Sequence, residues 1–191
     1  MPKTGDVLDE GAEQIEFLAT AADTGGELVR CRVHVAASRP APPEHSHPHQ
    51  EERFVVERGR LGYVLGDSRL EAGPGKEVVV PPGINHTFWN AGSEELSIVS
   101  EVRPALQFED FVETIHVLIR DGRLPAGGRR PNPLLLAVVA HAFRQEWRMT
   151  KLSPAVRAAL PVLALIGRIA GYRARYSLHD ESREPRASAA V

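Results

Sequence analysis

Three histidines at alternate positions and two adjacent glutamates lie close together in the stretch EHSHPHQEERFVVERG, residues 44–59. Imidazole nitrogens and carboxylate oxygens form a ligand set that suits a divalent first-row metal ion. A carboxylate is costly to bury unless it is paired or binds a cation, so an inward cluster of these groups indicates a metal site. The chemistry therefore depends on which of five side chains point inward: His45, His47, His49, Glu51 and Glu52.

The alternation of a β-strand separates the two glutamates. Successive side chains on a strand point to opposite faces. Phe54 and Val56 are apolar and two positions apart, and Glu52 continues their face of the strand. Glu51 falls on the other, more polar face. We therefore expect Glu52 to point inward and Glu51 to point outward.

The same reasoning divides the histidines. His45 and His47 share one face of an extended segment. The change from their odd positions to the even position of Glu52 requires a turn, and Pro48 favours one. His49 falls on this turn, where we expect a solvated side chain or an indirect role at the site. Two histidines and one glutamate then point inward, and they need a further ligand.

A second pattern supplies that ligand. In GKEVVVPPGINHTFWN, residues 75–90, a short apolar strand ends at Pro81-Pro82-Gly83. Proline and glycine favour a tight turn, after which His86 opens the next strand.

Together the two patterns resemble the two-motif signature of the cupin superfamily. They read H-x-H-x4-E-x6-G and G-x5-P-x-G-x2-H-x3-N. Every motif position is occupied, by His45, His47, Glu52 and Gly59 in the first pattern and by Gly75, Pro81, Gly83, His86 and Asn90 in the second. The resemblance covers about residues 28–103. It implies a mainly β fold, a cupin-type antiparallel jelly-roll barrel.

The resemblance also implies a metal site in the mouth of the barrel. Cupins hold one divalent transition metal, and Fe, Mn, Ni, Zn, Co and Cu all occur among them. The ligands here would be His45, His47, Glu52 and His86. Glu52 could also act as a base when its bond to the metal loosens. Most aromatic residues of the barrel should belong to its core, and those we expect to line a substrate pocket are Phe54, Tyr63 and Phe88.

The barrel that positions these residues is expected over residues 15–104. In ELVRCRVHV, the residues Cys31, Val33 and Val35 share one face, and further short apolar stretches follow, separated by Gly, Pro, Asp and Asn. Strands at this spacing indicate an all-β sandwich or barrel. The polar and acidic residues 1–14 are expected to form an N-terminal tail.

The chain then changes to a helical pattern. Apolar residues recur at helical spacing from Phe108 to Ile119. Asn132-Pro133 and Ser153-Pro154 each combine an N-cap residue with proline at the first helical position, so they predict two more helices.

From the start signal of the second predicted helix, apolar residues run on to Trp147, and the third helix should end near Ala170. Pro161 should kink or split the third helix. Between the first two helices, DGRLPAGGRRP reads as a loop. We expect a helical extension over residues 105–178 and a disordered tail over residues 179–191.

Composition narrows the class of protein. The net charge of -2 implies no general affinity for nucleic acid. Cys31 is the only cysteine, which excludes an intrachain disulfide and fits a reducing compartment. The N-terminus lacks the apolar run of a signal peptide, and the most apolar segment, residues 160–166, is far shorter than the roughly 18–20 residues that span a bilayer. We expect a cytoplasmic protein without a membrane span.

Charge and apolar surface suggest self-association. Residues 1–103 carry 10 Lys+Arg and 17 Asp+Glu, a net charge of -7. Residues 104–191 carry 13 Lys+Arg and 8 Asp+Glu, a net charge of +5. Helices that are apolar over wide faces must be covered on several sides. We expect a homodimer in which residues 105–178 contribute to the interface or brace the barrel. Capping the barrel mouth is the other role open to this extension.

Two functions of different classes fit this pattern. The first is a metal-dependent enzyme acting on a small organic molecule, aromatic or enol-type, either dioxygenase-like or a non-redox isomerase, cyclase or lyase. The second is a non-catalytic cupin that binds or senses a small ligand. The C-terminal helices show no clear helix-turn-helix pattern, which disfavours a DNA-binding sensor. We favour the enzyme, with the metal, the substrate and the reaction left open.

Overall fold

The computed structural model describes residues 1–124 and 131–178. Its strands, in chain order, are β1 (Val7–Asp9), β2 (Glu13–Ala19), β3 (Val29–Val35), β4 (His45–Ser46), β5 (Glu51–Arg58), β6 (Leu61–Leu65), β7 (Ser68–Ala72), β8 (Glu77–Val80), β9 (His86–Asn90), β10 (Leu96–Arg103) and β11 (Arg148–Met149). Its helices are α1 (Phe108–Arg120), α2 (Pro133–Ala142) and α3 (Pro154–Ile169).

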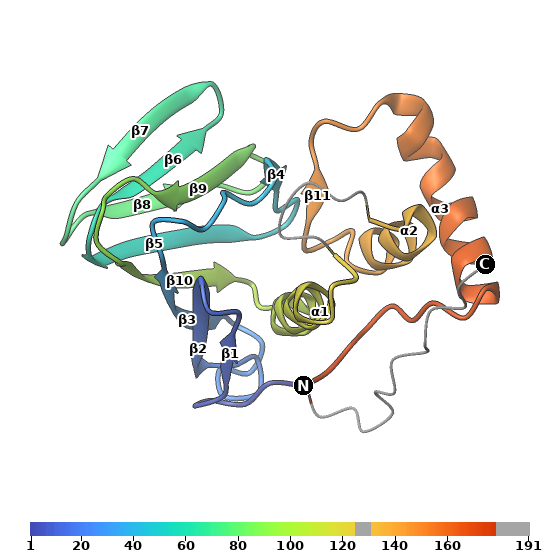
Figure 1. The fold of residues 1–191 in the computed structure, drawn as a ribbon, viewed down its shortest axis with the longest axis horizontal. Helices are drawn as coiled ribbons and strands as arrows, with labels where there is room; N and C mark the ends of the chain where they lie inside the picture. The colour runs from blue at the N-terminus through green and yellow to red at the C-terminus, as the bar shows by residue number, and fades with distance from the viewer. Residues whose placement is uncertain (125–130, 179–191) are drawn as a thin grey trace.

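The strands form two antiparallel sheets that face each other (Figure 1). The first sheet has the order β1-β2-β3-β10-β5-β8, and the second has the order β11-β4-β9-β6-β7. The helices gather at one end of the sheets, on the side of β11 (Figure 1). This arrangement confirms the predicted mainly β fold followed by a helical extension.

Strand alternation decides which side chains enter the core. In β5, Glu52, Phe54 and Val56 are buried, whereas the residues between them are only half-buried. The Phe54 ring meets the ring of Phe88, from the opposite sheet, with 5.2 Å between centroids. The inner faces of the two sheets therefore pack on each other and form one core.

The N-terminal residues form more than a tail. Within residues 1–14, β1 pairs antiparallel with the start of β2, and Leu8 is 1% exposed. The prediction of a tail was wrong here because a three-residue strand with a single buried side chain shows no alternation that a sequence pattern could reveal.

The helices begin where the capping signals predict. The Asn132 side chain accepts hydrogen bonds from the backbone N–H groups of the first turn of α2. The Ser153 hydroxyl accepts one from the Val156 N–H at the start of α3. Pro161 lies inside α3 without splitting it into two helices. The first stretch, α1, buries the predicted apolar face against the barrel.

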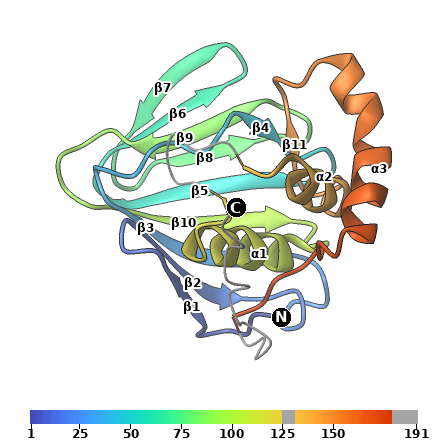
Figure 2. The same cartoon turned by 45° about the vertical axis from the view of Figure 1, so that its right-hand side comes forward.

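The end of α2 falls inside the apolar run that reaches Trp147. The helix ends at Ala142, and Phe143 after it is 1% exposed, with its ring 5.5 Å from that of Phe111. The chain then runs into β11, which pairs with β4 so that Met149 lies opposite His45. Figure 2 shows β11 beside β4 and α1 beside the first sheet. The extension is thus joined to the barrel by a strand.

Some predicted segments fall on residues outside the described part of the chain, namely part of the loop (125–130) and the C-terminal tail (179–191). Among the helices of residues 1–124 and 131–178, none combines the length and the apolar character needed to cross a membrane.

Candidate metal centre

Four buried side chains converge where the two sheets meet the helical extension. One possible ligand atom from each lies within 4.8 Å of those from the others. Cross-strand pairing of β4 with β9 sets His45 opposite His86, and β5 brings Glu52 from the other sheet. The structure thereby brings together the four residues named as ligands from the sequence: His45, His47, Glu52 and His86.

Backbone carbonyls fix the orientation of all three imidazoles. Nδ1 of His45 donates to the Pro43 carbonyl at 2.8 Å, and Nδ1 of His86 donates to the Ile84 carbonyl at 3.1 Å. Nδ1 of His47 donates to the Glu146 carbonyl at 2.5 Å. A proton held on Nδ1 leaves Nε2 with a free lone pair, which is the form in which histidine binds a metal.

The three Nε2 atoms and the carboxylate then need a cation. His86 Nε2 lies 2.9 Å from Glu52 Oε2, and His47 Nε2 lies 3.3 Å from the same oxygen. If Nε2 carries no proton, lone pairs face each other across these distances. Donor atoms bonded at about 2.1 Å to one ion, at right angles, lie about 3.0 Å apart. In addition, His47 Nε2 is buried and has no hydrogen-bond partner. The donor set therefore fits a metal ion.

The electrostatics of the cluster point the same way. Burial lowers the pKa of His45 to about 3, helped by the neighbouring His86 and His47, so this imidazole is neutral. Burial alone would raise the pKa of Glu52, but the hydrogen bonds and charges of His47 and His86 hold it well below its usual range. Burial alone would lower the pKa of His47, yet the carboxylate of Glu52, 3.3 Å from its Nε2, raises it. The site thus favours a positive charge beside an ionised carboxylate.

Groups that the sequence did not indicate support the cluster. The Ser100 hydroxyl donates to Glu52 Oε1 at 3.1 Å and holds the carboxylate in place. The Trp147 ring lies 5.7 Å from the His45 ring, and the Phe108 ring lies 5.6 Å from the His47 ring. Ser100 stands at an inward position of β10, so strand alternation could have indicated it. The Glu146 carbonyl carries no sequence signal, because every residue has one.

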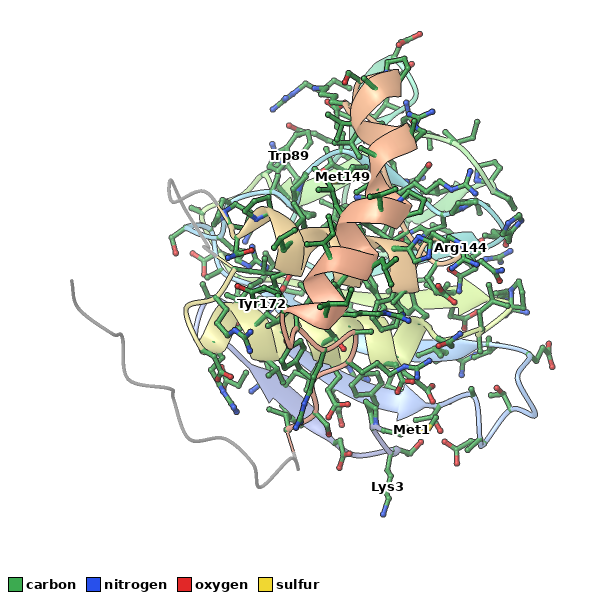
Figure 3. All side chains as sticks on the ribbon, turned by 90° about the vertical axis from the view of Figure 1, so that its right-hand side faces the viewer. Met1, Lys3, Trp89, Arg144, Met149 and Tyr172 are labelled. Atoms are coloured by element: carbon green, nitrogen blue, oxygen red, sulfur yellow. The ribbon has the colours of Figure 1, made fainter. Side chains whose placement is uncertain are left out.

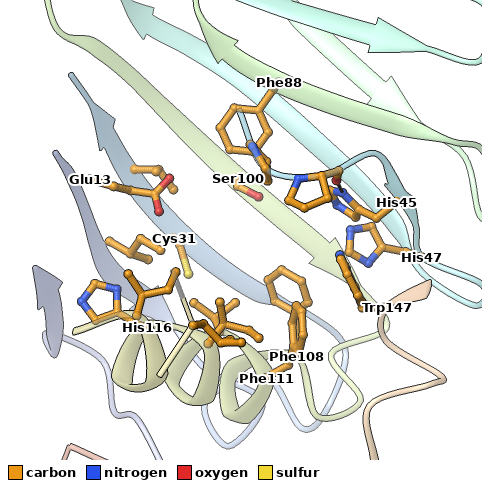
Figure 4. A pocket seen from close by; sticks show the side chains of 18 of the residues that line it. Glu13, Cys31, His45, His47, Phe88, Ser100, Phe108, Phe111, His116 and Trp147 are labelled. Atoms are coloured by element: carbon orange, nitrogen blue, oxygen red, sulfur yellow. Dashed lines mark hydrogen bonds between the residues drawn. The ribbon is translucent and has the colours of Figure 1, made fainter. Parts of the chain in front are cut away.

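A cavity of about 530 Å³ opens beside the cluster, with His45, His47 and Glu52 in its wall. Small-molecule sites have volumes of about 300–1,000 Å³ and are mostly apolar. Inward residues of β2, β3 and β5 form one side of the cavity, and residues of α1 and α2 form another. Figure 4 shows this arrangement, with α1 running along the cavity opposite the strands. The helical extension therefore covers the cavity.

Two of the three residues predicted to line a substrate pocket lie in the wall of the cavity. Phe54 and Phe88 line the cavity, but Tyr63 is not among the described residues that do so. Tyr63 lies on β6, on the far side of β9 from β4, and packs against the core opposite Phe88. Alternation gives the face of a residue but not its distance along the sheet from the ligands, so the role of Tyr63 in a substrate pocket stays a prediction. His49 is exposed on its turn, and Glu51 is half-buried beside Arg53.

The far end of the cavity is polar. Its lining includes Glu10, Glu13, Arg39 and His116. His116 is buried, and its Nδ1 lies 3.0 Å from Glu10 Oε1. Burial raises the pKa of Glu10 to about 7, with Arg39 opposing the shift and Glu13 adding to it. Burial also lowers the pKa of His116.

Comparison with known proteins agrees with this geometry. Residues 31–101 match the family model of the cupin domain. This chain carries a cupin domain. The matched residues hold all four side chains of the cluster. Among curated proteins, no match to the chain was found.

Several solved structures are similar to about half of this chain. KdgF from Halomonas sp. shares 18% identity at a TM-score of 0.47, over 53% of this chain and 88% of that one. A Klebsiella pneumoniae protein with a double-stranded β-helix domain shares 23% identity at a TM-score of 0.44, over 51% of this chain and 82% of that one. Oxalate decarboxylase from Bacillus subtilis shares 17% identity at a TM-score of 0.45, over 52% of this chain and 28% of that one.

Replacing one ligand should remove the metal. His86→Ala and Glu52→Ala should each lower the affinity for divalent metal by more than about tenfold, since loss of a ligand costs at least as much as loss of a ligand's hydrogen-bond partner. Glu51→Ala, on the outer face of the same strand, is the matched control. Metal content is measured by elemental analysis of protein purified without chelators. Loss of metal from Glu51→Ala with retention in Glu52→Ala would contradict the assignment.

The half-buried Glu10 should make stability depend on pH. Its pKa in the folded protein, about 7, exceeds the ordinary value of 4.5. The folded state therefore binds this proton more tightly, and the stabilisation present below pH 4.5 is lost as the pH rises through 7. Relative to wild type, Glu10→Gln should have a higher melting temperature at pH 8 and a flatter dependence between pH 4.5 and 7. The exposed Glu94→Gln controls for loss of charge. If the melting temperatures of wild type and Glu10→Gln changed with pH in the same way, Glu10 would not be the source of the pH dependence.

Proposed function

We propose that this cupin is a metal-dependent enzyme that acts on a small, largely apolar organic molecule bound in the cavity. The observation that carries the proposal is the position of the histidine–glutamate cluster in the wall of a 530 Å³ cavity. A purely structural metal site is closed by its ligands and surrounded by packed side chains. Here the space beside the cluster is large enough for a small molecule.

The four buried side chains, His45, His47, Glu52 and His86, would hold one divalent transition metal. When bound, the ion supplies Lewis-acid activation of an enol, carbonyl or carboxylate oxygen, and a redox-active ion adds oxygen chemistry. Three nitrogens and one oxygen leave coordination positions open for the substrate. Glu52 can accept a proton from the substrate through Oε2, while Ser100 holds its other oxygen.

The walls of the cavity select the type of substrate. Phe54 and Phe88 approach from the barrel, and Phe108, Phe111 and Trp147 approach from the helical extension. These rings exclude water from the metal end and favour an aromatic or enol-type head group over a charged one. Either a dioxygenase-like reaction or a non-redox isomerisation, cyclisation or lysis suits such a site.

Incubation of metal-loaded protein with a panel of enols and 1,3-dicarbonyls tests the proposal. Fe, Mn, Ni, Co, Zn and Cu are loaded separately, and products are analysed by mass spectrometry with and without oxygen. We expect turnover with at least one metal, lost in His86→Ala and kept in Glu51→Ala. Oxygen dependence separates the dioxygenase-like reaction from the non-redox ones. Saturable binding without turnover for every metal would overturn the enzyme and favour a cupin that binds or senses a ligand.

We also propose that the protein is a homodimer that uses α3. Figure 3 shows α3 on the outside of the helical extension, in front of α2. Exposed apolar side chains follow one another at helical spacing along it, namely Val162, Leu165, Ile166 and Ile169. A contiguous exposed apolar stripe is typical of an interaction surface. A second copy presents the same stripe, and two such stripes can cover each other around a two-fold axis.

Light scattering tests the dimer. Wild type should have twice the mass of the chain, and Leu165→Glu should have the mass of one chain, because the new carboxylate would be buried in the interface. Arg157→Glu, also exposed on α3, controls for the introduced charge. A wild-type protein that is monomeric at micromolar concentration would disprove the dimer.

A further inference from the structure

The two polar ends of the cavity lie far apart along the first sheet. Near the metal end, Glu52 of β5 lies opposite Val102, which in turn lies opposite Val29 of β3. At the other end, Glu13 lies opposite Val35 of β3. Val29 and Val35 are about 20 Å apart along the strand at about 3.3 Å per residue. In Figure 4, His116 and Glu13 lie at one end of the cavity, and His45, His47 and Trp147 lie at the other.

The character of the wall changes between these ends. Aromatic rings surround the metal end, as Figure 4 shows for Phe88, Phe108 and Trp147. The remaining wall is mostly aliphatic, with Ile15 and Val33 from the strands and with Val112, Ile115 and Ile119 from α1. A ligand that fills the cavity would therefore combine a head group at the metal with an aliphatic body that reaches toward His116.

At the far end, two buried donor or acceptor atoms lack a partner within the described residues. His116 is 3% exposed, and its Nε2 has no hydrogen-bond partner. Arg39 binds Glu13 at 2.8 Å through one terminal nitrogen, yet its Nε is also buried without a partner. Buried polar groups are normally hydrogen-bonded, so a ligand atom in the cavity would complete these two.

The charges around these atoms favour a neutral ligand group. Glu10 lies 3.0 Å from His116 and 3.8 Å from Arg39, and Glu13 also faces the Arg39 guanidinium. An anionic ligand group would meet two glutamates there, whereas the single arginine is already paired. A hydroxyl group can accept from the Arg39 Nε–H and share a proton with His116 Nε2, without a net charge to neutralise.

We propose that the ligand is an elongated molecule with an aliphatic body, a metal-binding oxygen at one end and a neutral hydroxyl group at the other, and that Arg39 and His116 bind this hydroxyl. The proposal rests on the proposed function, because it takes the same cavity and the same metal as the site of the head group.

Alkyl hydroxamates of increasing chain length provide the probes, since a hydroxamate head binds divalent metals. Each chain is made with a terminal methyl, hydroxyl or carboxylate, and affinity for metal-loaded full-length protein is measured by calorimetry. At the best chain length, the hydroxyl probe should bind about tenfold more tightly than the methyl probe, the gain expected when a buried unpaired group finds its partner. The carboxylate probe should bind more weakly than the hydroxyl probe.

His116→Leu tests the role of the imidazole, and His141→Leu is the matched control, because His141 lies on α2 outside the cavity lining. In His116→Leu the preference for the hydroxyl probe should disappear while the affinity for the methyl probe is kept. Three outcomes would overturn the hydroxyl subsite alone. In wild type, all three probes could bind equally, or the carboxylate probe could bind more tightly than the hydroxyl probe. In His116→Leu, the methyl and hydroxyl probes could be weakened equally. Failure of every probe to bind the metal-loaded protein would overturn the proposed function together with this inference.

Discussion

A carboxylate buried among three imidazoles is the constraint on which the rest of the structure depends. Glu52 is 5% exposed and lies within 3.3 Å of two ring nitrogens. An isolated buried carboxylate is strongly unfavourable, so this position demands a positive charge, either a proton or a metal ion. Because the histidines are held with their Nδ1 protons on carbonyls, a metal ion satisfies all four groups at once, whereas a proton satisfies only one pair.

This constraint links the barrel to the helical extension. The carbonyl that orients His47 belongs to Glu146, and β11 pairs directly with β4, which carries His45. Phe108 and Trp147 add rings beside these histidines. The extension therefore does more than cover apolar surface of the barrel. It completes the surroundings of His45 and His47 and lines the cavity beside them, so docking of the extension and order at the candidate metal site should be energetically coupled.

The convergence of the candidate ligands could be predicted because each position depends on local rules. Strand alternation places Glu52 inward, and its partner at position 51 is half-buried on the outer face. Proline turns separate the histidines from that strand and aim His86. The helix starts at Asn132 and Ser153 follow from side-chain capping, which is equally local. In all these cases the physical cause lies within a few residues of its effect.

What could not be predicted depends on contacts between distant segments. The Glu146 carbonyl and the two-residue β11 leave no pattern in the sequence, and the separation of Tyr63 from β4 depends on the order of the strands. His116 follows the apolar Ile115 on α1, and its role depends on Glu10, next to a strand too short to recognise. The polar end of the cavity therefore emerges only when the N-terminal strands, the loop after β3 and α1 are assembled.

Anomalous X-ray diffraction at the absorption edge of the bound metal would test the metal site most directly, using crystals of protein purified without chelators and then supplied with the divalent metal it binds best. A single anomalous peak is expected within about 2.0–2.3 Å of the three Nε2 atoms and the Glu52 carboxylate, facing the cavity. A peak at other residues, or no peak among His45, His47, Glu52 and His86 in metal-supplied crystals, would contradict the account.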